Sequence, residues 1–250
     1  MIELRNICKT FNDVVVLNGI NAKIEQGETF VIIGQSGTGK TVTLRHIAGL
    51  VDPDSGDVFV DGIRMNGASR RVKDGLRRRM GIVFQSGALI NWMTVRDNIA
   101  LPLREQQLLS LEEIDREVDE KLEVLQLSEA QYKMPAEISG GMRKRASLAR
   151  VLVINPDIIL YDEPTSGLDP VMSSLINELI RQMQQEYGLT SVVVTHDMNS
   201  AYYIADRIAM LYKGEIIQCD TPDGIKNTNN HIVEQFIYGN LEGPIDLHRI

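Results

Sequence analysis

The sequence predicts an α/β fold built on a parallel or mixed sheet with helices around it. Three continuous apolar runs, at 29–33, 157–161 and 191–195, are typical of strands that are buried on both faces. A helical pattern over 171–187 separates the last two runs. Strands that alternate with helices in this way are joined by crossovers, which make neighbouring strands parallel. The carboxyl ends of such strands lie along one edge of the sheet, where proteins of this class bind ligands.

The first sixty residues predict short strands joined by turns. Residues 14–17 and 58–60 are rich in the β-branched types that favour strands. Between them, a helix is expected to start at Gly39 and to end near Gly49, because glycine commonly terminates helices.

We expect the middle of the chain to be helical and its C-terminal end to be a tail. Ser110 and Glu113 form a capping box ahead of an apolar helical pattern. A second helical pattern covers 142–153. From His231 the periodicity is weak and Gly243 interrupts it, so we expect the last twenty residues to be a tail.

Size and charge limit the class of protein. The 250 residues are 43% hydrophobic, which allows one substantial core and a small appended subdomain. A formal net charge of −8 argues against a nucleic-acid partner. Cys8 and Cys219 are too few for a disulfide framework or a metal cluster. No apolar stretch approaches the roughly 20 residues that cross a bilayer, and the first residues lack the apolar core of a secretory signal. We therefore expect a cytoplasmic protein that acts at a membrane only through partners.

A glycine-rich segment after the first buried run matches the phosphate-binding pattern G-x-x-x-x-G-K-[ST]. It consists of Gly34, Gln35, Ser36, Gly37, Thr38, Gly39, Lys40 and Thr41. The glycines let several N–H groups point at one phosphate, and the following helix adds its positive end. Lys40 supplies charge for the β- and γ-phosphates, Thr41 can ligate magnesium, and Thr43 is included in the nucleotide site. The alternative is a simple glycine turn, but the position between a buried strand and a helix favours a site for ATP and Mg²⁺.

Two more strand ends bring polar groups to the same edge. Asp162 and Glu163 follow the run at 157–161, and His196 follows the run at 191–195. Magnesium prefers oxygen ligands and keeps several waters, so we assign it Asp162. Because successive strand residues point to opposite sides, Glu163 has a different task, which we take to be general base for the attacking water. The alternatives are a charged strand end and a structural histidine.

Ser139, Gly140 and Gly141 start the helical pattern that follows and form a second potential anion site. The alternative is a simple helix cap. One chain has no need to aim two phosphate sites at one nucleotide, whereas two chains packed head to tail would each complete the other's site.

These motifs resemble those of the ABC family of ATPases, in the family's order over roughly residues 1–225. Ile138-Ser139-Gly140-Gly141-Met142 is similar to the signature, Gln85 to the Q-loop, Ser166-Gly167-Leu168-Asp169 to the D-loop, Thr195-His196-Asp197 to the H-loop, and Phe11 to the aromatic residue that stacks on adenine. Two departures are mild, because phenylalanine at 11 lacks the usual tyrosine hydroxyl and methionine at 142 replaces the usual glutamine. Neither removes a catalytic group, so the resemblance implies a working ATPase.

The resemblance also implies residue roles. Ser139, Gly140 and Gly141 would bind the γ-phosphate of ATP held by a second copy of the chain, in a head-to-tail homodimer. Gln85 would contact magnesium and the attacking water as a catalytic residue. His196, also counted as catalytic, would contact the γ-phosphate, and Asp169 would link the two nucleotide sites.

The fold implied is that of a P-loop NTPase of the ABC type. It has a mixed or parallel core sheet flanked by helices, a small antiparallel β subdomain, and a helical subdomain at approximately 87–153. The ATPase domain would cover 1–228, and 229–250 would be a C-terminal tail.

One branch of the family is the most similar. Residues 84–89 and 94–103, with the Ser-Gly-Gly-Met signature and Gly243-Pro244, are similar to the ATPases of Mla-type phospholipid transporters. This likeness implies partners in the form of integral-membrane permease subunits and an MCE-domain lipid-binding protein, at the cytoplasmic face of the inner or plasma membrane. The ATPase of another transporter or of a cell-division complex would share every catalytic residue. A soluble iron–sulfur assembly ATPase would have the same size, whereas DNA-repair ABC ATPases carry long coiled-coil insertions that are not seen here.

Two further segments have open interpretations. The basic segment 70–79 is either a face for anionic lipid or, as charge runs usually are, a solvated stretch. Trp92 and Met93 either line a groove for a permease helix or pack locally.

Overall fold

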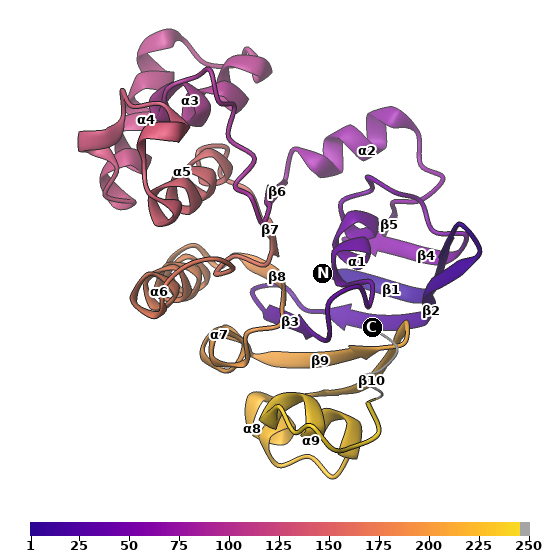
Figure 1. The fold of residues 1–250 in the computed structure, drawn as a ribbon. Coiled ribbons are helices and arrows are strands. Elements are labelled where there is room, and N and C mark those ends of the chain that lie inside the picture. The colour runs from indigo at the N-terminus through magenta and orange to yellow at the C-terminus, as the bar shows by residue number, and fades with distance from the viewer. Residues whose placement is uncertain (246–250) are drawn as a thin grey trace.

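The computed structural model describes residues 1–245, which form two β-sheets with helices around them (Figure 1). The larger sheet has six strands in the order β10-β9-β3-β8-β7-β6. They are β3 (Thr29–Ile33), β6 (Met80–Val83), β7 (Ile158–Asp162), β8 (Thr190–Thr195), β9 (Arg207–Tyr212) and β10 (Glu215–Asp220). Strand β3 pairs in parallel with β8 and β9, and β7 pairs in parallel with β6 and β8. Only the edge pair β9–β10 of this sheet is antiparallel, so the predicted mixed sheet is confirmed.

The central strands are buried on both faces, as their continuous apolar sequence predicts. Alternate residues of β3 enter two different hydrophobic cores, because successive side chains of a strand point to opposite faces. Val31 and Ile33 belong to the core shared with the helical region. Phe30 and Ile32 belong to the core shared with the smaller sheet.

The smaller sheet is antiparallel, with its strands in the order β2-β1-β4-β5. Its strands are β1 (Ile2–Phe11), β2 (Val14–Ile24), β4 (Ser55–Val60) and β5 (Ile63–Arg64). The predicted antiparallel β subdomain is therefore present. It lies beside α1 (Lys40–Ile47) and α2 (Arg70–Arg77) (Figure 1).

Three α-helices gather away from the sheets at the upper left of Figure 1, between β6 and β7 in the chain. They are α3 (Val95–Gln106), α4 (Leu111–Val124) and α5 (Gly140–Leu152), with short 3-10 turns at Ser128–Ala130 and Pro135–Glu137. The expected capping box of Ser110 and Glu113 starts α4. The remaining helices are α6 (Pro170–Tyr187), α7 (Met198–Ile204), α8 (Pro222–Lys226) and α9 (His231–Tyr238). No helix within residues 1–245 is long and apolar enough to cross a membrane.

The C-terminal region differs from the expected tail. Residues 231–238 form helix α9, and Val233 is fully buried in the same core as the helical region. Gln235 is also buried, and its Oε1 accepts a 2.7 Å hydrogen bond from the backbone N–H of Ile245. The weak periodicity missed this helix because a short helix needs only a few buried contacts. The domain boundary at 228 stays a prediction, and residues 246–250 of the predicted tail lie outside the described residues.

Candidate active site

The glycine-rich segment between β3 and α1 has a backbone that only glycine allows at two positions. Gly34 has φ 154°, and a Cβ there would lie 2.4 Å from the carbonyl oxygen of Leu211. Gly39 has φ 103°, and a Cβ there would lie 2.6 Å from Leu17 Cδ2. Helix α1 begins directly after Gly39 without a side-chain cap. Its first N–H groups are therefore left for an anionic ligand.

Lys40 lies over this loop and is only 6% exposed. Its Nζ donates to the carbonyl oxygens of Gly34 at 2.7 Å and Gln35 at 2.9 Å. Burial lowers the pKa of Lys40, although the nearby carboxylates of Glu163 and Asp162 oppose this shift. A partly desolvated cation beside the uncapped N-terminus of a helix is what a polyphosphate requires.

Thr41 and Asp162 provide oxygen atoms beside the loop. The Thr41 hydroxyl donates to Asp162 Oδ1 over 2.9 Å. Burial raises the pKa of Asp162, and the hydrogen bond from Thr41 opposes the rise. No cluster of three His, Cys, Asp or Glu side chains able to hold a metal occurs in the part of the chain that the structure describes. One carboxylate and one hydroxyl suit magnesium, which completes its shell with phosphate oxygens and water.

Glu163 follows β7 with φ 49°, a left-handed conformation that is uncommon for residues other than glycine. The simple alternation expected for strand residues therefore does not apply, and both carboxylates reach the site. Glu163 Oε2 lies 2.9 Å from His196 Nδ1 and accepts from Thr195 Oγ1 at 3.2 Å. Its Oε1 lies 3.9 Å from Lys40 Nζ. This carboxylate is well positioned to accept a proton beside the phosphate loop.

A hollow of about 410 Å³ joins these elements. Its lining comes from β2, the phosphate loop, α1 and the strand ends, and consists of Val16, Ser36, Gly37, Gly39, Lys40, Thr41, Val42, Gln85, Glu163 and His196. Gln85 lies after β6 and donates from Nε2 to the Ser166 hydroxyl at 3.1 Å. The structure thus brings together eight of the predicted site residues, and Gln85 is one of them.

Gly34, Gln35, Thr38 and Asp162 are absent from this lining but belong to the same loop and strand end, and Asp162 is hydrogen-bonded to Thr41. Four other predicted elements also lie outside the lining. Phe11, at the end of β1, is 42% exposed, and Lys9 Nζ lies 5.3 Å from its ring centroid. The Thr43 hydroxyl is buried and donates to the carbonyl of Gly39 within its own helix. Asp169 Oδ1 caps α6 by accepting from the N–H groups of Val171 and Met172.

The Ser139–Gly141 segment is the fourth of these elements, and it starts helix α5. The Ser139 hydroxyl accepts from the N–H of Met142 at 3.2 Å, so the expected cap exists. A Cβ at Gly141 would lie 2.3 Å from Met172 Cε, which shows how closely α5 begins against α6. Within one chain this segment does not line the hollow.

Two residues at the site were not found from the sequence. Val16 on β2 lines the hollow beside the phosphate loop, and only its β-branched strand pattern marked it. Lys144 on α5 is 7% exposed, and its Nζ donates to the carbonyl oxygens of Gln85 and Glu163. In the sequence it is one of several basic residues after the Ser-Gly-Gly segment, with nothing to distinguish it.

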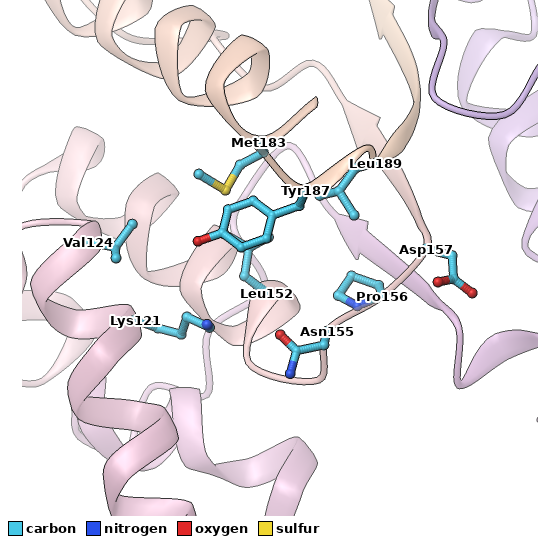
Figure 2. A pocket seen from close by; sticks show the side chains of 9 residues that line it. All are labelled: Lys121, Val124, Leu152, Asn155, Pro156, Asp157, Met183, Tyr187 and Leu189. Carbon is cyan, nitrogen blue, oxygen red and sulfur yellow. The ribbon is translucent and has the colours of Figure 1, made fainter. Parts of the chain in front are cut away.

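A second hollow, of about 190 Å³, is shown in Figure 2. Lys121 and Val124 of α4, Met183 and Tyr187 of α6, and the turn at Asn155 line it. Asp157, just before β7, is at its edge, so this hollow lies at the amino end of the strands. Parallel-sheet proteins bind their ligands at the opposite, carboxyl end, where the phosphate loop lies.

The fold and the loop geometry define a phosphate-loop nucleoside-triphosphate hydrolase, because a buried strand, a glycine loop, a lysine and two carboxylates meet at one edge of the sheet. A family model described as ABC transporter matches residues 17–166. The chain therefore belongs to the ABC transporter family, whose ATP-binding subunits bind ATP with Mg²⁺ and hydrolyse it.

Several relatives cover nearly the whole chain. The "Intermembrane phospholipid transport system ATP-binding protein MlaF" of Escherichia coli (strain K12) is 36% identical over 98% of this chain and 91% of that protein. The "Probable ribonucleotide transport ATP-binding protein mkl" of Mycobacterium leprae (strain TN) is 38% identical over 98% of this chain and 71% of that protein. Among solved structures, the dimeric ATP-binding cassette MJ0796, bound to ADP and Pi in a post-hydrolysis state, has a TM-score of 0.83. It is 35% identical and covers 89% of this chain and 99% of its own.

Proposed function

We propose that this chain is the ATP-hydrolysing subunit of a transporter that moves phospholipid or a similar lipid, and that two copies work beneath a membrane-embedded permease. In this arrangement the chain is peripheral on the cytoplasmic face of the membrane. It never contacts the cargo, because its task is to convert ATP binding and hydrolysis into movement of its partners.

The phosphate loop holds the triphosphate in this proposal. The N–H groups of residues 34–41 surround the phosphates, and the buried Lys40 ammonium contacts the β- and γ-phosphate oxygens in place of its present carbonyl acceptors. The Thr41 hydroxyl and Asp162 Oδ1, which lie 2.9 Å apart, would hold the magnesium ion together with Gln85. Phe11 stacks on the adenine, and Val16 packs beside it.

Glu163 is the proposed general base, and this assignment rests on three contacts of its carboxylate. The contacts with His196 and Thr195, together with the nearby Lys40, point its oxygens into the hollow. A carboxylate there accepts the proton of the water that attacks the γ-phosphate. His196 then lies where its ring contacts the γ-phosphate and holds the carboxylate in place.

The Ser139–Gly141 segment completes the site of a second copy in this proposal. Since the segment starts a helix and does not line its own chain's hollow, its free N–H groups are available to a γ-phosphate that another chain holds. Asp169 caps helix α6, which begins close to the start of α5, and in this proposal it links the two sites.

The assignment of a lipid cargo rests on one observation above all. The phospholipid-transport relative matches this chain over nearly the full length of both proteins, whereas the ribonucleotide-transport relative extends well beyond it. The Ser-Gly-Gly-Met signature supports the same branch. The competing cargo is a ribonucleotide, since identity to that relative is slightly higher.

Replacement of the proposed base tests the hydrolytic part. Glu163→Gln should leave ATP binding intact, lower the hydrolysis rate at least about 100-fold and trap an ATP-bound dimer. Glu112→Gln, at an exposed position of α4, is the matched control and should hydrolyse ATP normally. Undiminished hydrolysis by the Glu163 variant would remove its assignment as base.

The proteins that bind this chain in the native membrane test the proposed lipid cargo. The tagged full-length chain should co-purify from detergent-solubilised native membranes with a permease and an MCE-domain protein, and the complex should contain phospholipid. A permease without an MCE-domain protein, or a purely soluble partner, would contradict the lipid assignment and leave the ATPase assignment standing.

A further inference from the structure

Lys144 is a buried cation whose hydrogen bonds go to two backbone carbonyl groups of the active site. It lies on the second turn of α5, the helix that Ser139 caps, and is 7% exposed. Its Nζ donates to the carbonyl oxygen of Glu163 at 3.1 Å and also to that of Gln85. One ammonium therefore connects helix α5 with the segment after β6 and with Glu163, the proposed general base.

The backbone of Glu163 needs such support. With φ 49° it has a conformation that side-chain-bearing residues adopt only when their surroundings hold it there. Its N–H donates to the carbonyl of Val194 at 2.9 Å, which secures one side of the residue. On the other side, its carbonyl accepts from Lys144 and, at 3.2 Å, from the N–H of Ser166.

The segment after Gln85 has a second cation from the same helix. Arg150 donates to the carbonyl oxygens of Ala88 at 2.7 Å and Gly87 at 3.1 Å. Lys144 and Arg150 thus both hold residues 85–88 against α5, but only Lys144 also reaches Glu163. Replacing Arg150 therefore weakens only the segment after Gln85, whereas replacing Lys144 also removes a hydrogen bond to Glu163.

We propose that Lys144 is a positioning residue for hydrolysis, which holds the backbone of Glu163 in its left-handed conformation and ties it to the Gln85 segment. Without the ammonium, the peptide after Glu163 relaxes and its carboxylate leaves its place beside His196 and Lys40. Nucleotide binding is retained, because the hydrogen bonds of Lys144 go to Gln85 and Glu163 and not to the phosphate loop. The inference rests on the proposed role of Glu163 as base.

The test is the Lys144→Met variant of the full-length chain, which keeps the length of the side chain and removes its charge. Binding of a fluorescent ATP analogue should stay within about threefold of the wild-type affinity. The single-turnover rate of ATP hydrolysis, measured at excess protein, should fall about 10- to 100-fold, since a shift of about 1 Å can cost that much. Lys144→Arg should restore at least about a third of the wild-type rate, because a guanidinium can donate to both carbonyl groups.

Arg150→Met is the matched control, because it loosens the same segment without touching Glu163. Its hydrolysis rate should stay within about threefold of wild type. The proposal is overturned if Lys144→Met hydrolyses ATP normally, if Arg150→Met loses as much rate, or if the arginine variant restores nothing. Where Lys144→Met does not fold, as judged by its thermal transition, Lys144→Gln takes its place with the same expected split between rate and affinity.

The Glu163→Gln variant separates this inference from the function on which it rests. Normal hydrolysis by Glu163→Gln would remove the base itself. A large loss in Glu163→Gln with no loss in Lys144→Met would overturn only the positioning role of Lys144.

Discussion

Ser139 is both a helix cap and a proposed phosphate ligand, and the two roles make different predictions. In one chain it is exposed, and its hydroxyl accepts a 3.2 Å hydrogen bond from the N–H of Met142. Ser139→Arg removes that bond, which costs about 1 kcal/mol of the free energy of unfolding. For a chain of this size the melting temperature should fall by roughly 2–4 °C. The arginine otherwise points into solvent, so ATP binding by the single chain should be unchanged.

Unlike ATP binding by the single chain, ATP-induced dimerisation should be lost in the Ser139→Arg variant. If Ser139 faces the γ-phosphate of a second copy, the large side chain blocks closure of the dimer. Light scattering after size-exclusion chromatography with ATP should show a dimer for the Glu163→Gln chain. The double variant that also carries Ser139→Arg should be a monomer. Ser139→Ala, which loses the same cap without added bulk, should still dimerise, although at a higher ATP concentration.

A second serine supplies the control. Ser110 is exposed and caps α4 in the same way, so Ser110→Arg should lower the melting temperature by a similar amount and leave the dimer intact. A Ser139→Arg chain that still dimerises at the ATP concentration used for Glu163→Gln would refute the shared-site reasoning. Loss of the dimer in Ser110→Arg would show that stability, and not the site, decides the outcome.

Three further changes test other parts of the structure. Gly34→Ala places a Cβ 2.4 Å from the Leu211 carbonyl, so the loop must move; the affinity for a fluorescent ATP analogue should fall at least about tenfold, and unchanged affinity would contradict the close approach. Thr41→Val removes a hydroxyl from the proposed magnesium site and should raise the Mg²⁺ concentration for half-maximal hydrolysis about tenfold in a Mg²⁺ titration. Val233→Asp puts an unpaired carboxylate into the core below α9 and should cost at least about 2 kcal/mol, or roughly 4–8 °C in a thermal melt. An unchanged melt would mean that α9 does not pack as described.

The phosphate loop illustrates what could be predicted. Its glycine, lysine and threonine positions follow from local needs, namely backbone curvature and charge, and the structure shows the left-handed glycines at Gly34 and Gly39. The buried strands were predictable for the same reason, because a strand covered on both faces must be apolar at every position.

Helix α9 and Lys144 illustrate what could not. The periodicity after His231 is weak because the helix is short and only Val233 and Gln235 are buried on it. Lys144 has basic neighbours in the sequence, and only folding places it against two carbonyl groups that are 59 and 19 residues away in the chain. Phe11 does not line the hollow, so its place at the adenine stays a prediction.

The sequence by itself determined the class of chemistry, because phosphate, magnesium and a water nucleophile each require particular residue types at short spacings along the chain. It also determined which strands lie at the centre of the sheet. Only the tertiary structure decided how the proposed base is held, since the left-handed backbone of Glu163 and its contacts with Lys144, Thr195 and His196 join residues distant in sequence. The physical reason is that a motif specifies groups and local geometry, whereas the orientation of a buried carboxylate depends on every element packed around it.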